Sequence, residues 1–173
     1  MVLWAQGSII LDAMSTEQTT ANRIRAWLLD QKYLVQDSGE QGKAFVLIAN
    51  ESTDTGFGFG ISQEVGKPRV ISLALTLPFD SYKPLLSDKP EERYSFLREL
   101  RLKIIQFDVE FNLPLDFTSV MIAKHVYLDG LTEDSFWRHV HEMRRAMLVV
   151  IWTLEQKFSI PFSDPNSFNV TTP

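Results

Sequence analysis

The chain of 173 residues contains no cysteine, so disulfide bonds, zinc–thiolate sites and cysteine nucleophiles are excluded. It also lacks an apolar run close to the roughly eighteen residues that span a bilayer. Its first basic residue is Arg23, so a signal peptide is not predicted either. Acidic residues outnumber Lys and Arg by 22 to 17, which disfavours nucleic acid as a partner because phosphate affinity needs clustered cations. We therefore expect a cytoplasmic protein with neither nucleic-acid nor membrane partners.

Recognisable catalytic and cofactor motifs are also missing. Gly56, Gly58 and Gly60 recur at every second position, which is the period of a strand and does not match a phosphate-binding loop. Serine, histidine and acidic residues occur, but no nucleophile-elbow motif surrounds them. The sequence therefore predicts a protein that is not an enzyme and carries no cofactor.

The three histidines do not form a metal-binding pattern. On a helix, His139 and His141 point about 200° apart, so they cannot bind one ion together. We expect His139 to pair with Glu142, and His141 to pair with Arg145, on the solvated surface. His125 lies in an alternating segment and is expected to be half-buried and hydrogen-bonded. No metal site is predicted.

The composition, with 45% hydrophobic and 23% charged residues, is that of an ordinary globular domain. We expect one domain over residues 15–158. Residues 1–14 form an N-terminal arm whose status is open between an edge strand, a packed arm and an upstream start. Residues 159–173 form an irregular C-terminal tail, because prolines interrupt the segment and no periodicity is present.

Three segments have helical periodicity. The longest covers residues 131–158 and has one apolar stripe, formed by Phe136, Val140, Met143, Met147, Ile151, Leu154 and Phe158. An earlier helix is predicted from about Thr16 to Lys32, after a cap at Ser15. A middle helix begins near Asp88 and keeps its apolar spacing to Phe111.

Four strands are predicted between these helices, at Ala44–Ala49, Gly56–Gln63, Arg69–Leu77 and residues 117–130. The order is α-β-β-β-α-β-α, and short connections favour antiparallel hairpins. This order predicts a single α+β domain with the helices packed on an antiparallel sheet.

One face of this sheet is expected to be poor in charge. If the apolar residues of the third and fourth strands face the helices, the opposite face carries small and amphipathic side chains. These are Gly56, Gly58, Gly60, Ser72, Ala74, Thr76, Met121, Ala123, His125 and Tyr127. Such a face suits either a wet sheet surface or a protein-interaction surface, and the two alternatives stay open.

Two stretches carry a resemblance to a known family. They are the turn Tyr127-Leu128-Asp129-Gly130-Leu131-Thr132, followed by Phe136, and the apolar run of residues 145–152. The chain resembles, over Ala21–Phe158, an uncharacterised prokaryotic family of cyanobacteria and archaea whose members are similar in fold to type III secretion chaperones. That fold usually has two strands between the last two helices, where this sequence predicts one.

The resemblance implies a homodimeric binding module that holds an extended protein or peptide segment, and it supplies no catalytic residue. The first hypothesis is therefore a non-enzymatic, chaperone-like or adaptor protein. The second is a small enzyme or ligand-binding domain that uses His125, Tyr127 and Asp129. The third is a structural subunit of a larger complex.

Overall fold

The computed structural model describes residues 5–51, 58–79, 90–114 and 118–158, with side chains from residue 18 onward. Within these ranges the helices are α1 (Ala5–Asp30), α3 (Pro90–Ile104) and α4 (Glu133–Phe158). The strands are β1 (Tyr33–Asp37), β2 (Lys43–Glu51), β3 (Phe59–Glu64), β4 (Val70–Pro78), β5 (Glu110–Asn112) and β6 (Ser119–Tyr127).

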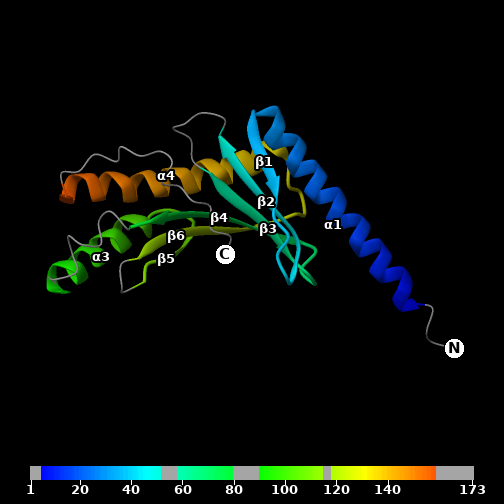
Figure 1. Ribbon diagram of the computed structural model, residues 1–173, viewed down its shortest axis with the longest axis horizontal. Helices are drawn as coiled ribbons and strands as arrows, with labels where there is room; N and C mark the ends of the chain where they lie inside the picture. The colour runs from blue at the N-terminus through cyan, green and yellow to red at the C-terminus, as the bar shows by residue number, and fades with distance from the viewer. Residues whose placement is uncertain (1–4, 52–57, 80–89, 115–117, 159–173) are drawn as a thin grey trace.

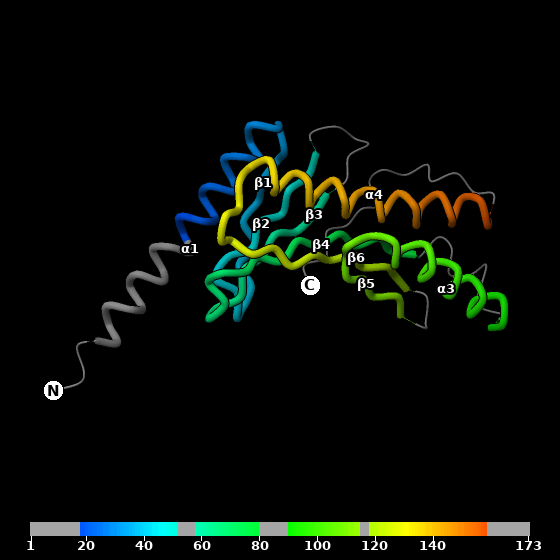
Figure 2. The backbone as a smooth tube through the Cα atoms, turned by 180° about the vertical axis from the view of Figure 1, so that it is seen from behind, coloured from blue at the N-terminus to red at the C-terminus, as the bar shows by residue number. Residues whose placement is uncertain are grey.

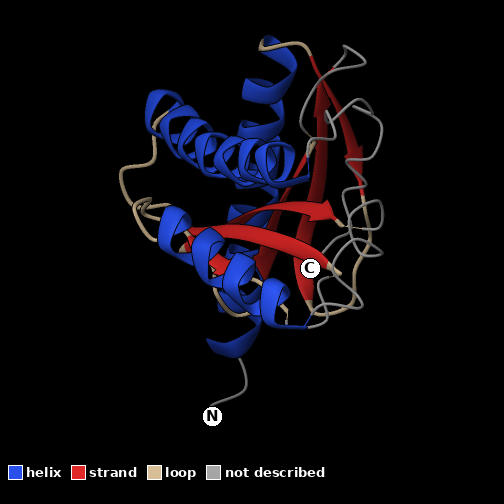
Figure 3. Cartoon of the chain, turned by 90° about the vertical axis from the view of Figure 1, so that its left-hand side faces the viewer, coloured by secondary structure: helices blue, strands red, loops and turns tan. Residues whose placement is uncertain are grey.

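The strands form one antiparallel sheet in the order β1-β2-β3-β4-β6-β5. The helices lie on one side of this sheet (Figure 3). Helix α4 runs along the sheet (Figure 1). The predicted α+β class, with helices packed on an antiparallel sheet, is confirmed.

The core lies between the sheet and the helices. In the centre of the sheet Leu75 stands opposite Ile122 and Leu77 opposite Val120, and each of these side chains is at most 2% exposed. The inner stripe of α4 covers them with Phe136, Val140, Met143 and Met147, which are also at most 2% exposed. Burial of apolar area at about 25 cal/mol per Å² makes this layer the main stabilising feature.

Strand β1 was not predicted. Helix α1 ends at Asp30, and Lys32 adopts a left-handed conformation with φ of 62°, which reverses the chain. Val35 of β1 then pairs with Ala49 of β2. The strand is only five residues long, so its alternation was too short to outweigh the helical pattern before it.

Strand β5 replaces the end of the predicted middle helix. Helix α3 stops at Ile104, and the Phe107 N–H donates to the Ile104 carbonyl at 2.9 Å in a turn. Phe111, which continued the helical spacing, instead pairs with Ile122 across the sheet. Two strands thus separate α3 from α4, so the predicted departure from the secretion-chaperone pattern was wrong. The chaperone-like label itself stays a prediction.

Other helix and strand boundaries also differ from the predicted ones. Helix α1 begins at Ala5, well before the start predicted at Thr16, and it crosses the expected boundary between residues 14 and 15. Strand β3 begins at Phe59, and Gly56 lies outside the described residues, as does the tail 159–173.

Candidate functional site

The residues of the predicted interaction face are buried or half-buried at its centre and exposed at one end. Gly58, Gly60 and Ala74 are buried, and four side chains are half-buried, namely Ser72, Thr76, Met121 and Ala123. His125 and Tyr127 are exposed, with Tyr127 at 71%. Gly56 is outside the described residues. Any functional use of this face is therefore concentrated at the C-terminal end of β6.

His125 lies in a serine–histidine–acid arrangement. Its Nδ1 is 2.9 Å from the Ser72 hydroxyl, directly across the β4–β6 ladder, and its Nε2 is 3.7 Å from a Glu110 carboxylate oxygen. If Nε2 carries the proton toward Glu110, Nδ1 accepts a hydrogen bond from Ser72. The order of groups is that of a nucleophile, a base and an orienting acid.

The backbone N–H of Ser72 is not placed to act as an oxyanion donor. The ladder directs its own N–H toward Ser62 of β3, so that group is used within the sheet. Asp129, the third residue of the predicted enzyme hypothesis, lies 3.7 Å from Arg69 in an exposed ion pair. The contacts with Ser72 and Glu110 orient the imidazole of His125 at the sheet surface.

Lys124 is the buried member of an ionic cluster on the opposite face of β6 from His125. Only 7% of this residue is exposed, and its Nζ donates to the Asp108 carbonyl at 2.6 Å, an Asp108 carboxylate oxygen at 2.8 Å and a Glu142 carboxylate oxygen at 2.7 Å. The Asp108 N–H in turn donates to Glu142 at 3.3 Å. All three ammonium protons are thus satisfied, and β6, the chain before β5 and α4 are tied together.

The cluster shifts the ionisation of its members in consistent directions. Burial alone would lower the pKa of Lys124, but the hydrogen bonds with Asp108 and Glu142 outweigh it and hold that pKa above its ordinary value. The hydrogen bond from Lys124 lowers the pKa of Asp108. Burial, aided by the Lys124 charge, lowers the pKa of His139, which is half-buried and not solvated as predicted.

The Lys124 cluster also limits how far the pairing of β5 with β6 extends. Glu110 pairs with Ala123, so continuation of the ladder would set Asp108 opposite His125. Instead, the Asp108 backbone is engaged by Lys124 and Glu142, which lie on the helix side of the sheet. Strand β5 therefore stops short, at the outer side of β6 (Figure 2).

The backbone of His125 and Tyr127 is left unpaired as a result. The Leu128 N–H donates to the Arg69 carbonyl at 2.8 Å, so alternate residues of β6, such as Val126, bond to β4. His125 and Tyr127 must then point their N–H and C=O groups outward, where no backbone partner exists among the described residues. We call these outward groups of His125 and Tyr127 the β6 edge.

Two hollows border the β6 edge. One, of about 210 Å³, is lined by Glu64, Lys67, Val70, Ser72, His125 and Tyr127. The other, of about 360 Å³, is lined by Asp108, Val109, Glu110, Lys124, His125 and Tyr127. Asp108 and Glu110 expose 92% and 67% of their side chains, so the second hollow presents carboxylates to solvent.

A separate ionic group lies where β1 begins and α4 passes. The Tyr33 hydroxyl donates to a Glu51 carboxylate oxygen at 3.0 Å and accepts from Arg144 Nη1 at 3.1 Å, while Arg144 Nη2 pairs with the same carboxylate. Burial raises the pKa of Tyr33 to about 12, and Glu51 adds to the rise while Arg144 opposes it. Sequence reasoning missed this group because its members come from three distant elements.

Two other kinds of site are not found within the described part of the chain. No group of three or more His, Asp or Glu side chains there is placed to hold a metal ion. Likewise, none of the described helices has the length and apolar character that crossing a membrane requires.

Comparison with known proteins places the fold. A family model described as "Uncharacterized conserved protein (DUF2299)" matches residues 20–154. The crystal structure of an uncharacterized protein from Methanothermobacter thermautotrophicus superposes with a TM-score of 0.72 and 23% sequence identity, and the match covers 79% of this chain and 97% of that chain. No curated protein matches the sequence. At this identity the likeness to the archaeal structure shows the fold alone.

Proposed function

The chain belongs to the uncharacterized conserved family DUF2299, and from the β6 edge we propose that it is a protein-binding module. In this proposal it acts without catalysis, as a chaperone-like or adaptor protein. It takes up an extended segment of a partner protein as an added strand beside β6.

The single observation that carries the proposal is that the outward backbone groups of His125 and Tyr127 have no backbone partner among the residues that the structure describes. An extended peptide can satisfy such groups by adding a strand, and the main-chain hydrogen bonds then supply affinity without a deep pocket. Tyr127, a residue that is 71% exposed, offers its ring for apolar contact with an incoming side chain.

The charges around the β6 edge indicate what the segment carries. Asp108 and Glu110 stand at its β5 end with exposed carboxylates. Alternate side chains of an added strand point to the same face, so a Lys or Arg on the His125 face meets the Glu110 carboxylate, whereas the Asp108 carboxylate already accepts a hydrogen bond from Lys124. We therefore expect an extended partner segment with basic residues.

Homodimerisation and a cytoplasmic location complete the proposal, and both rest on the resemblance to secretion chaperones and on composition. In this proposal a second copy binds at the other edge strand of the described sheet, β1, and leaves the β6 edge to the partner segment.

Selection from a library of displayed short random peptides tests the proposal. We expect enriched peptides that contain β-forming residues alternating with Lys or Arg, because these suit strand addition beside Asp108 and Glu110. Binding of a synthetic copy is then measured by calorimetry with the full chain.

Glu110→Gln provides the matched variant, since it keeps the shape of the side chain and removes the charge. It should weaken binding of a basic peptide by several-fold, consistent with about 1 kcal/mol for an exposed ion pair. Failure to enrich any peptide, or enrichment of helical amphipathic sequences bound elsewhere, would count against the proposal.

The Ser72–His125 contact of 2.9 Å favours one second candidate, a small hydrolytic or ligand-binding domain at the same strand end. Treatment with a fluorophosphonate probe separates the two functions. Covalent labelling that disappears in Ser72→Ala would support the enzyme, whereas the binding module leaves the probe unreacted.

A further inference from the structure

A third hollow lies away from the β6 edge, and the proposed function makes no use of it. Its volume is about 550 Å³, and it sits where α1 ends, β1 begins and α4 passes. Its lining includes Lys32, Tyr33, Glu51, Trp137, His141 and Arg144. These residues combine flat rings with both signs of charge.

Three rings border the hollow, with Tyr33 buried beneath Trp137 and with His141 exposed. Tyr33 and Trp137 are stacked with centroids 5.5 Å apart and an interplanar angle of 28°. His141, one helical turn beyond Trp137, has its ring centroid 6.4 Å from that of the indole. A flat ligand ring placed here would find aromatic partners along its length.

The charged wall beside these rings is fixed in place. Glu51 binds both Arg144 and the Tyr33 hydroxyl, and the side chains of Glu51 and Arg144 are only 24% and 23% exposed. Glu51 and Arg144 offset each other's charge, and Lys32 adds a cation to the lining of the hollow.

Lys32 occupies a position where its side chain is disfavoured. Its φ of 62° is left-handed, and its N–H donates to the Leu29 carbonyl at 3.0 Å as the residue that ends α1. Glycine is the usual residue at such a position. At the other left-handed positions of the described chain, glycine is present: Gly42, Gly66 and Gly130.

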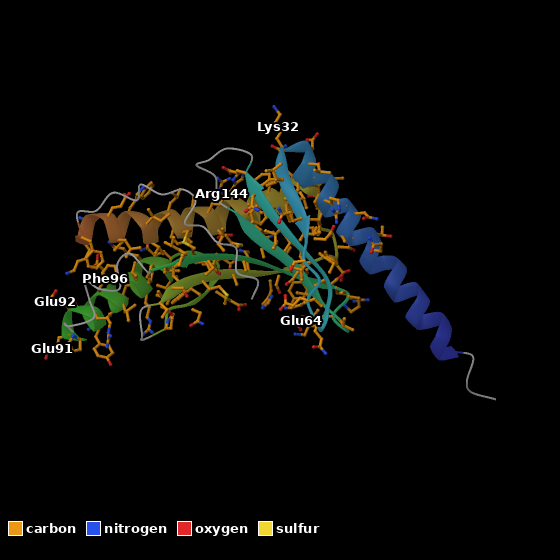
Figure 4. All side chains as sticks on the ribbon, viewed as in Figure 1. Lys32, Glu64, Glu91, Glu92, Phe96 and Arg144 are labelled. Carbon is orange, nitrogen blue, oxygen red and sulfur yellow. The ribbon has the colours of Figure 1, made fainter. Side chains whose placement is uncertain are left out.

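A backbone outlier beside a hollow points to a role for the side chain that outweighs its conformational cost. Figure 4 shows Lys32 at the end of α1, extending past the end of the sheet, and Arg144 on α4. The flexible lysine stem therefore stands at the rim of the hollow, from which its ammonium can turn toward a bound anion.

We propose that this hollow binds a small organic anion whose flat aromatic body lies against Trp137 and His141 and whose acidic group meets Lys32. The acidic group is a carboxylate or a phosphate, since a lysine ammonium serves both as a point charge.

Isothermal titration of the full chain with benzoate, adenosine monophosphate and inorganic phosphate tests the inference. We expect benzoate or adenosine monophosphate to bind more tightly than inorganic phosphate, because only the organic anions stack on the rings. Benzoate binding would identify an aromatic carboxylate and adenosine monophosphate binding a nucleotide-like phosphate.

Lys32→Gly is the decisive variant because it separates two effects. It should raise the midpoint of thermal unfolding, since glycine relieves the left-handed strain, and weaken binding of the organic anion about tenfold by removing the charge. Lys32→Arg keeps both the strain and the charge, so it should bind like the wild type.

Three results would overturn the inference. They are the absence of binding by both organic anions, binding of inorganic phosphate as tight as theirs, and unchanged affinity in Lys32→Gly. None of these bears on the β6 edge, which lies on other residues, so failure here and failure of the proposed function are distinguishable.

Discussion

Replacing Lys124 with alanine is expected to lower the free energy of unfolding by about 2–4 kcal/mol, because it removes a buried cation and leaves the half-buried Glu142 carboxylate without it. The ammonium group makes three short hydrogen bonds, to the Asp108 backbone, the Asp108 carboxylate and Glu142. Without it, Glu142 keeps a charge on a side chain that is only 28% exposed. Equilibrium unfolding in urea, followed by circular dichroism, measures the loss.

Lys67→Ala is the matched control. Lys67 also pairs with a carboxylate, that of Glu64, but its side chain is 65% exposed, so the same substitution should change stability by no more than about 0.5 kcal/mol. Lys124→Met retains most of the apolar stem, so its stability separates the contribution of side-chain packing from that of the ion pairs. If Lys124→Ala cost no more than Lys67→Ala, the cluster would not hold β6 to α4.

Replacing Tyr127 with proline is expected to weaken binding of a selected peptide at least about tenfold while the fold survives. Proline removes the outward N–H of the β6 edge and leaves the hydrogen bonds between β6 and β4 intact, since those belong to the neighbouring residues. Calorimetry with the selected peptide gives the affinity, and thermal unfolding verifies the fold.

Two variants isolate the cause. Tyr127→Ala removes the ring but keeps the N–H, so it reports on side-chain contact alone. Asp37→Pro makes the same backbone change on β1, at the other edge of the sheet, where the register also directs the N–H outward. We expect Asp37→Pro to bind the peptide like the wild type, and equal losses in both proline variants would show that the peptide does not use β6.

The parts of the fold that sequence reasoning predicted are those that local periodicity encodes. The stripe of α4 from Phe136 onward and the alternation of β4 and β6 each repeat several times within one element, so the buried face follows from spacing alone. Strands β1 and β5 are defined by their partners. Phe111 has apolar spacing that fits a helix, and only its pairing with Ile122 makes it a strand residue.

The site was predictable in part for the same reason. His125 and Tyr127 were identified as members of a charge-poor face, but whether their backbone is free depends on which residues of β6 bond to β4. The sequence alone does not show whether the odd-numbered or the even-numbered residues of β6 bond to β4. The Lys124 cluster joins β6, the segment before β5 and α4, and the Tyr33 group joins three other segments, so neither leaves a local pattern.

Amide hydrogen exchange at His125 and Tyr127, resolved by NMR with and without the selected peptide, tests the proposed strand addition most directly. In the free protein both amides should exchange rapidly, whereas Val126, which bonds to β4, should be protected. Bound peptide should slow exchange at His125 and Tyr127 by about tenfold or more and leave Val126 unchanged. Protection of both amides in the free protein, or no change on binding, would contradict an open β6 edge that accepts a strand.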